Sequence, residues 1–304
     1  MKRIWLVLLL VMNVLWAAAY ACFKLLAPVM DAGTLATLRF GLSALIISFV
    51  WRWIPGVRPR GWDLFRTGLL GVMVFCAAPR LQVSGVQLGK AGDAAILMAF
   101  DPVIAAVFAA IFLREHVPLR RWLGFSLGLV GVAVLAEFWR PDFQWPGLVA
   151  NALILASFVC ESVYSIVGKP LIQKSHPLKV LAAGLLIGTA ANLVFSGKDV
   201  VRSLPHLGAS DWLALGYLVI ICTVVGYSLW FFAVRETPVN AVAMTVFAQP
   251  LAGVLFALVL VAEPLRWSQL AGGVVIALGL YFSLPAATSR NRFAHVGADR
   301  IVGP

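Results

Sequence analysis

Two stretches of the chain carry one pattern, AFDPVIAAVFAAIFLREHVPLRRWLGFSLGLVGVAVL at residues 99–135 and VFAQPLAGVLFALVLVAEPLRWSQLAGGVVIALGLYF at residues 246–282. Each has a proline near its start, an apolar run that ends at a glutamate, and a second apolar run marked by glycines. One offset that serves many identical pairs predicts an internal repeat. A shift of 148 residues superimposes Pro102 on Pro250, Phe108 on Phe256, Ala109 on Ala257, Glu115 on Glu263, Gly124 on Gly272 and Gly131 on Gly279.

The composition excludes a water-soluble protein. Of the 304 residues, 62% are hydrophobic and 12% are charged, and the mean hydropathy is +0.94. Ordinary soluble domains have about 25% charged residues. A formal net charge of +11 would indicate a nucleic-acid partner in a soluble chain, but in a membrane protein basic residues gather in the cytoplasmic loops. We therefore expect the lipid bilayer as a partner and no nucleic acid.

Charged residues, prolines and glycines divide the chain into ten apolar stretches. A membrane-spanning helix needs about 20 apolar residues. The first stretch follows Lys2 and Arg3, as a secretory signal would, but its apolar run continues to Val29. The sequence predicts an all-α polytopic membrane protein with ten transmembrane helices, at residues 4–26, 32–51, 67–88, 91–113, 121–138, 147–168, 178–195, 210–233, 238–261 and 268–286.

The distribution of basic residues predicts the orientation. With ten spans and the N-terminus inside, sixteen lysines and arginines fall on the cytoplasmic side and six on the other, as the positive-inside rule requires. We expect an integral multi-pass protein of the bacterial inner (plasma) membrane, with both the N and C termini in the cytoplasm.

The repeat extends to the start of each half. A shift of 145 residues aligns Lys24 with Lys169, so helices 1–5 match helices 6–10. Because five is odd, the second copy enters the membrane from the opposite side, which gives a 5+5 inverted repeat around a central cavity, as in many transporters. We expect a first repeat at residues 1–140, a second at 141–287 and a basic cytoplasmic tail at 288–304.

The two quoted stretches resemble the two EamA domains of the drug/metabolite transporter (DMT) superfamily. Pro102, Glu115, Gly124 and Gly131, with their mates in the second half, occupy the shared pattern. The resemblance covers nearly the whole chain and implies ten helices in two bundles, with a central cavity lined mainly by helices 1, 3, 4, 6, 8 and 9. It implies a permease but names no solute, since similar proteins carry amino acids, sugars, nucleotide sugars and drugs, often outward.

Two charged residues are predicted to lie near the middle of the bilayer. Arg80 comes ten residues before the bend near Lys90 and Asp101 comes eleven residues after it. At 1.5 Å per residue, both lie about 15 Å deep. We expect them to pair in the substrate site, because lone charges are costly there. Their repeat mates are Ser228 and Gln249, and Gln249 is a further candidate for substrate binding.

Polar stripes on helices 1 and 6 are candidates for the cavity lining. Their members recur every three or four residues, which places each set on one helix face. Under the offset of 145, Trp16 matches Glu161. Such residues also join helices through interhelical hydrogen bonds, and that interpretation stays open. The stripes are Asn13, Trp16, Tyr20 and Lys24 in helix 1, and Ser157, Glu161, Ser165 and Lys169 in helix 6.

Aromatic residues are candidates for a wall against an apolar or aromatic solute. They are Trp16, Tyr164, Tyr227, Trp230 and Phe231. Tryptophan and tyrosine also anchor helices at the membrane interface, and this alternative stays open.

Prolines and charged residues near the ends of the spans have other expected roles. Pro102 and Pro250 each remove a backbone N–H, and we expect them to act as hinges or as simple bends. Glu115 and Glu263 are expected to anchor loops. Arg39 is expected to reach toward the interface or to bind a neighbouring loop, and a role in substrate binding is the alternative.

These features predict a secondary transporter that exports a small organic metabolite or drug by alternating access. Glu161 is the candidate proton-coupling residue, because Arg80 and Asp101 cancel and no cation is evident at its depth. The sequence has no GxxxxGK[ST] motif and no metal-binding spacing, so we expect no cofactor, no metal and no catalytic residue. The alternatives are a polytopic membrane enzyme and a protein that translocates lipid or lipid-linked sugar. The expected partner is a small-molecule solute, and the chain is a monomer or homodimer.

Overall fold

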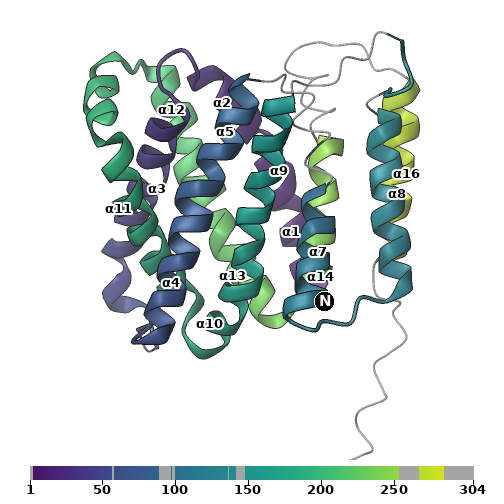
Figure 1. The fold of residues 1–304 in the computed structure, drawn as a ribbon, viewed down its shortest axis with the longest axis horizontal. Coiled ribbons are helices and arrows are strands. Elements are labelled where there is room, and N and C mark those ends of the chain that lie inside the picture. Colours follow the sequence, from purple (N-terminus) through teal and green to yellow (C-terminus); the bar gives the residue numbers. More distant parts are fainter. Residues whose placement is uncertain are drawn as a thin grey trace, which may run out of the picture.

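The described residues form a helical bundle. The structure, a computed structural model, describes residues 3–56, 58–88, 97, 100–135, 137–141, 148–252 and 267–283. Helices and turns make up this part of the chain, which contains no strand, so the predicted all-α fold is confirmed there. Figure 1 shows the helices side by side. The α-helices are α1 (Arg3–Ala17), α2 (Ala19–Leu26), α3 (Ala32–Phe49), α4 (Trp62–Val72), α5 (Ala78–Leu88), α7 (Asp101–Phe112), α8 (Leu119–Leu135), α9 (Leu148–Val163), α10 (Lys169–Lys174), α11 (Pro177–Ser203), α12 (Ala209–Tyr217), α13 (Gly226–Glu236), α14 (Val239–Ala243) and α16 (Trp267–Ser283).

Among the described residues, six helical segments are long and apolar enough to cross a membrane. Three shorter apolar helices coincide with other predicted stretches. The count of ten spans and the 5+5 repeat stay predictions, because residues 89–96, 253–266 and 284–304 lie outside the described part. The six segments are Arg3–Leu26, Ala32–Phe49, Trp62–Leu88, Val149–Lys174, Pro177–His206 and Ala209–Glu236, and the shorter helices are Asp101–Phe112, Val239–Ala252 and Leu270–Phe282.

Apolar side chains cover much of the outer surface of the bundle. Phe49, Val194 and Leu213 are each more than three quarters exposed. In water such a surface would promote aggregation, whereas lipid tails surround it at little cost. The core between the helices is also apolar and includes the fully buried rings of Phe40 and Phe75. Both observations agree with an integral membrane protein.

Four long helices are broken near their middle. A single turn at Ala18 separates α1 from α2. π-Helical turns interrupt the others: η2 (Met73–Ala77) between α4 and α5, η4 (Tyr164–Gly168) between α9 and α10, and η6 (Leu218–Val225) between α12 and α13. Shifted by 148 residues, η2 falls inside η6, and shifted by 145 residues, Ala18 falls next to η4. The breaks therefore follow the offsets of the sequence repeat.

Side chains from other helices bind the carbonyl groups that these breaks release. Pro79 lacks the N–H that would reach the Phe75 carbonyl four residues earlier, and Asn192 Nδ2 donates to that carbonyl instead, at 2.8 Å. Trp16 Nε1 donates to the Cys222 carbonyl in η6, also at 2.8 Å. A buried carbonyl without a partner is costly in a membrane, so these bonds make the irregular turns tolerable.

Glycines bring α8 and α16 into close contact at one edge of the bundle (Figure 1). A Cβ atom on Gly131 would lie 2.9 Å from the Gly272 carbonyl oxygen, and one on Gly279 would lie 2.9 Å from that of Gly124. These four glycines are the pairs that the offset of 148 superimposes. The two contacts are therefore repeat mates of each other, as in two helices that cross about a pseudo-two-fold axis.

We predict that Gly131→Ala destabilises the protein by about 1–3 kcal/mol, because an added methyl group would overpack α8 against the α16 backbone. The matched control is Gly216→Ala in α12, where a Cβ atom would meet nothing within 4 Å. That change should be neutral or slightly stabilising. The measurement is the unfolding temperature of the purified protein in detergent, and equal effects of the two substitutions would contradict the close contact.

Candidate functional site

A cavity of about 120 Å³ opens between the helices, next to the broken segments. Residues from both predicted repeats line it. Helix α3, which the family resemblance did not imply, contributes Arg39 and Phe40. The predicted site residues in the lining are Trp16, Asp101, Glu161, Tyr164, Tyr227, Trp230 and Gln249.

An aromatic wall forms one part of the cavity. The ring of Trp16 lies 5.8 Å from that of Tyr227 and 5.5 Å from that of Trp230, centroid to centroid. The bond from Trp16 to the Cys222 carbonyl fixes the indole in this position. These three residues come from the first and the second predicted repeat, and their rings present a broad apolar surface to the cavity.

Asn13 lies behind the cavity and positions one of its polar groups. It is fully buried, and its Oδ1 accepts a bond from Gln249 Nε2 at 2.8 Å. Its Nδ2 donates to Thr245 Oγ1 at 3.0 Å and to the Leu9 carbonyl at 2.8 Å. In this structure Asn13 therefore orients Gln249 and does not itself line the cavity.

The predicted ion pair between Arg80 and Asp101 is wrong. Arg80 Nε donates to Asn192 Oδ1 at 2.8 Å, and Nη2 donates to Ser196 Oγ at 2.7 Å. Both partners belong to α11, so Arg80 turns away from the cavity, whereas Asp101 lines it. Equal depth in the bilayer places two residues at one level but does not fix the side of the helix on which each lies.

The predictions for the surroundings of Arg39 and Glu161 are also wrong. Arg39 does not reach the interface, because it is only 8% exposed and its Nε donates to Thr223 Oγ1 at 2.8 Å. It lines the same cavity as Glu161. Glu161 therefore does have a cation nearby, and its carboxylate experiences the charges of both Asp101 and Arg39.

The structure describes the two predicted hinge prolines but not the side chain of Tyr20. The side chain of Tyr20 lies outside the described part of the structure. Pro102 is in the first turn of α7, where its missing N–H costs nothing. Pro250 follows a 3₁₀ turn, η7 (Met244–Phe247). The hinge role of both prolines stays a prediction.

Sequence reasoning missed three polar groups of the cavity, namely the Gln82 amide and the hydroxyl groups of Ser162 and Tyr164. Ser162 lines it beside Glu161, and the hydroxyl groups of Ser162 and Tyr164 are buried without a hydrogen-bond partner among the described residues. Tyr164 was predicted only for its ring. Its hydroxyl and that of Ser162 can still bind a polar group of a ligand. The available signal was that Ser162 directly follows Glu161 in the sequence.

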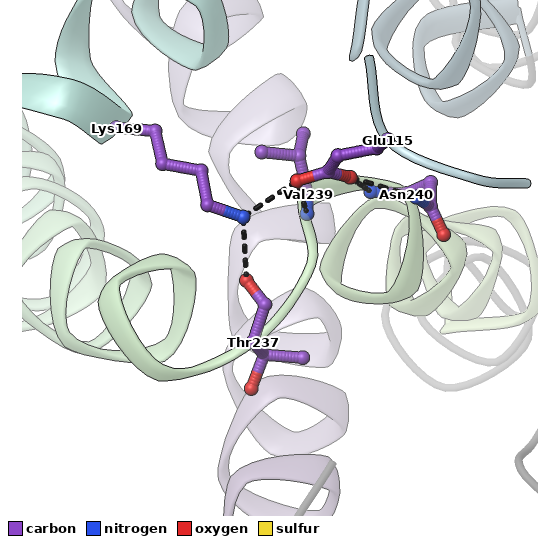
Figure 2. Close-up of polar contacts among 5 residues, drawn as sticks. All are labelled: Glu115, Lys169, Thr237, Val239 and Asn240. Atoms are coloured by element: carbon purple, nitrogen blue, oxygen red, sulfur yellow. Dashed lines mark hydrogen bonds and ion pairs between the residues drawn. The ribbon is translucent and has the colours of Figure 1, made fainter. Parts of the chain in front are cut away.

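At the end of the bundle that carries α10, one carboxylate holds three segments together (Figure 2). Glu115 accepts bonds from Lys169 Nζ at 2.5 Å, Val239 N at 3.1 Å and Asn240 Nδ2 at 2.7 Å. Lys169 Nζ also donates to the Thr237 carbonyl at 3.3 Å. Glu115, Lys169, Thr237, Val239 and Asn240 form what we call the Glu115 cluster. The prediction that Glu115 anchors a loop is confirmed, whereas Glu263 lies outside the described residues.

The backbone beside Glu115 is strained. Arg114 has φ of 51°, a left-handed conformation that usually belongs to glycine at a helix end. The N–H groups of Leu113 and Glu115 both donate to the Ala109 carbonyl, which closes α7. A non-glycine residue in this conformation costs about 1–2 kcal/mol. The bonds of the Glu115 cluster therefore hold Arg114 in a backbone conformation that it would otherwise avoid.

Comparisons with known proteins agree on the family. The EamA-like transporter family matches residues 3–136 and, a second time, residues 148–284. An "Uncharacterized transporter" of Archaeoglobus fulgidus is 27% identical over 92% of this chain and 98% of its own length. A solved crystal structure shares the fold, with a TM-score of 0.72 at 18% identity over 92% of this chain and 96% of the other.

Two further relatives have more specific names. A "Probable amino-acid metabolite efflux pump" of Salmonella typhimurium is 26% identical over 91% of this chain and 93% of its own length. A "Probable terminal-alkyne amino-acid exporter" of Streptantibioticus cattleyicolor is 24% identical over 98% of this chain and 99% of its own length. These names indicate transporters rather than enzymes.

We predict that Asn192→Leu destabilises the protein by about 3 kcal/mol, because it removes an acceptor from a charged group inside the bundle and leaves the Phe75 carbonyl unpaired. Ser196→Ala, which removes one bond, should cost less. The double variant Arg80→Met with Asn192→Leu should be more stable than Asn192→Leu alone. Thermal unfolding in detergent measures all three, and a double variant that is no more stable would show that Arg80 does not depend on Asn192.

Proposed function

Because the chain belongs to the EamA-like transporter family, we propose that it is a secondary transporter that exports a small organic metabolite by alternating access. The observation that carries this proposal is the polar cavity between the two matched regions. Asp101 lines it from the first region, and Glu161 and Gln249 line it from the second. A solute held between two halves that rock against each other can face either side of the membrane in turn.

The architecture that we propose is the 5+5 inverted repeat with ten spans and both termini in the cytoplasm. The matched breaks in the long helices and the crossed glycine contacts of α8 and α16 support it. The names of two relatives refer to amino-acid metabolites and to an amino acid. They favour a solute that has the size and polarity of an amino acid.

In this architecture, the Glu115 cluster closes the cytoplasmic end of the cavity. Glu115 belongs to the first repeat and its partners to the second, so the halves cannot separate at this end while its bonds persist. Val239, which belongs to the cluster, also lines the cavity. Opening toward the cytoplasm therefore requires the Glu115 carboxylate to leave Lys169 and the start of α14.

We predict that Glu115→Gln makes the cavity about tenfold more reactive from the cytoplasmic side, because it removes the ion pair and weakens the bonds to α14. The reporter is Ala243→Cys in a cysteine-free background, and the measurement is its labelling rate by a thiol reagent in inside-out vesicles. Ala243 lines the cavity. The matched control is Asp63→Asn, which removes weaker ion pairs to Arg66 and Lys174 outside the cavity.

Equal labelling rates in the Glu115→Gln, Asp63→Asn and parent proteins would contradict a closing role for the cluster. A rate that rises only in Glu115→Gln would support it.

Glu161 is the residue that we propose for proton coupling. It lines the cavity from α9, opposite groups of both signs, since Asp101 of α7 and Arg39 of α3 face the same space and Tyr227 of α13 lies among them. Binding a proton would remove one negative charge from the cavity, and losing it would restore that charge. Such a change of charge can link the occupancy of the cavity to the proton gradient.

We predict that Glu161→Gln retains solute exchange but loses the dependence of net flux on a pH gradient, because glutamine cannot gain or lose the proton. Glu161→Asp, which keeps a titratable group, should retain part of that dependence. The measurement is amino-acid flux in proteoliposomes with and without a pH gradient. Unchanged gradient-driven flux in Glu161→Gln would exclude Glu161 as the coupling residue.

A further inference from the structure

Arg39 is held in the cavity in a fixed orientation, and none of the described residues supplies an anion that pairs with it. Its Nε is bonded to Thr223, and its guanidinium carbon lies 4.9 Å from the centre of the Phe40 ring and 5.8 Å from that of Phe23. Among the described residues, it forms no ion pair with Asp101 or Glu161, although all three line one cavity. Cation and carboxylates thus share a space without direct contact.

The carboxylates of the cavity likewise have no hydrogen-bond or ion-pair partner within the part of the chain that the structure describes. Asp101 and Glu161 accept no hydrogen bond from any described residue. Close to them, the Tyr164 hydroxyl is buried and unpaired, in a side chain that is 5% exposed. Ionisable and polar groups in a membrane are normally paired or functional. Arg80 shows the contrast, because its bonds to Asn192 and Ser196 satisfy it outside the cavity.

We propose that Arg39 binds the carboxylate of the solute while Asp101, with the Tyr164 hydroxyl, binds its ammonium group, so that the cavity selects α-amino acids with an apolar or aromatic side chain. This inference rests on the proposed function, whose substrate class it makes specific. The side chain of the solute lies against the wall formed by Trp16, Tyr227 and Trp230.

The charges of the cavity argue against simpler solutes. A purely cationic solute would leave Arg39 without an anion, and a purely anionic one would leave the carboxylates without a cation. A zwitterion satisfies both signs at once. The planar guanidinium also matches a carboxylate with two parallel hydrogen bonds, which the ammonium of a lysine cannot provide.

Three probes that share one ring and chain length test the inference on the full-length protein in detergent. They are L-phenylalanine, phenethylamine, which lacks the carboxylate, and 3-phenylpropionate, which lacks the ammonium group. The measurement is the dissociation constant of each. The parent protein should bind L-phenylalanine at least about tenfold more tightly than either analogue, as expected when a charged hydrogen bond is lost.

The variants assign each charge to its residue. Arg39→Gln should abolish the preference over phenethylamine while binding phenethylamine as the parent does, and Arg39→Lys should retain part of that preference. Asp101→Asn should abolish the preference over 3-phenylpropionate. The matched control is Arg66→Gln, at an exposed arginine outside the cavity, which should bind all three probes as the parent does.

The inference is overturned if the parent binds the three probes equally or binds none, or if Arg39→Gln weakens all three alike. Should Arg39→Gln fail to fold, Arg39→Lys decides, and an undiminished preference over phenethylamine would overturn it. Flux of L-phenylalanine in proteoliposomes separates this inference from the proposed function. Selective binding without flux refutes transport but supports the charge assignment, whereas flux without selectivity supports transport and refutes the assignment.

Discussion

A carbonyl group that loses its helical partner inside a membrane has no water to bind, and this constraint shapes the centre of the molecule. The long helices around the cavity are broken near their middle, and at three of the four described breaks a side chain from another helix binds a carbonyl group. Asn192 binds the Phe75 carbonyl and Trp16 binds that of Cys222. The Tyr217 hydroxyl binds the Leu15 carbonyl beside the break after α1. The bonds that stabilise the irregular turns therefore also fix the helices against one another and set the position of Trp16 in the cavity wall.

The charged groups inside the bundle fall into two sets with different surroundings. Arg80 and Lys169 have protein partners in fixed geometry and join helices, at mid-depth and at one end. Arg39, Asp101 and Glu161 share the cavity without such partners among the described residues. Leaving a charge unpaired costs stability, and in our proposal a solute or a proton offsets that cost at these three residues. The distinction between scaffold and site follows from the partners of each charge and not from its depth.

The sequence predicted the family, the helical fold and seven residues of the cavity lining, because helical spacing and the offset of an internal repeat can both be read along the chain without knowledge of the packing. Trp16 and Glu161 were found from a stripe on one face and an offset between halves. The surroundings of Arg39 could not be predicted, because Thr223 lies 184 residues away and the rotation of α3 depends on packing. The Arg80 and Asp101 pair was wrong for the same reason. Pro79 was a readable signal for the π turn, since it removes the N–H that the Phe75 carbonyl needs, but no proline marks the turn at Leu218–Val225.

The crossed glycine contact of α8 and α16 also bears on how such a chain assembles. In a pair of identical five-helix chains, the contact of Gly131 with Gly272 and that of Gly279 with Gly124 would be one contact made twice, as in an isologous interface. One substitution in such a chain would change both contacts at once. In the joined chain, a substitution at Gly131 changes one contact and leaves that of Gly279 with Gly124 as it is. The covalent connection also makes the contact independent of protein concentration. Two separate halves would first have to meet by diffusion in the plane of the membrane.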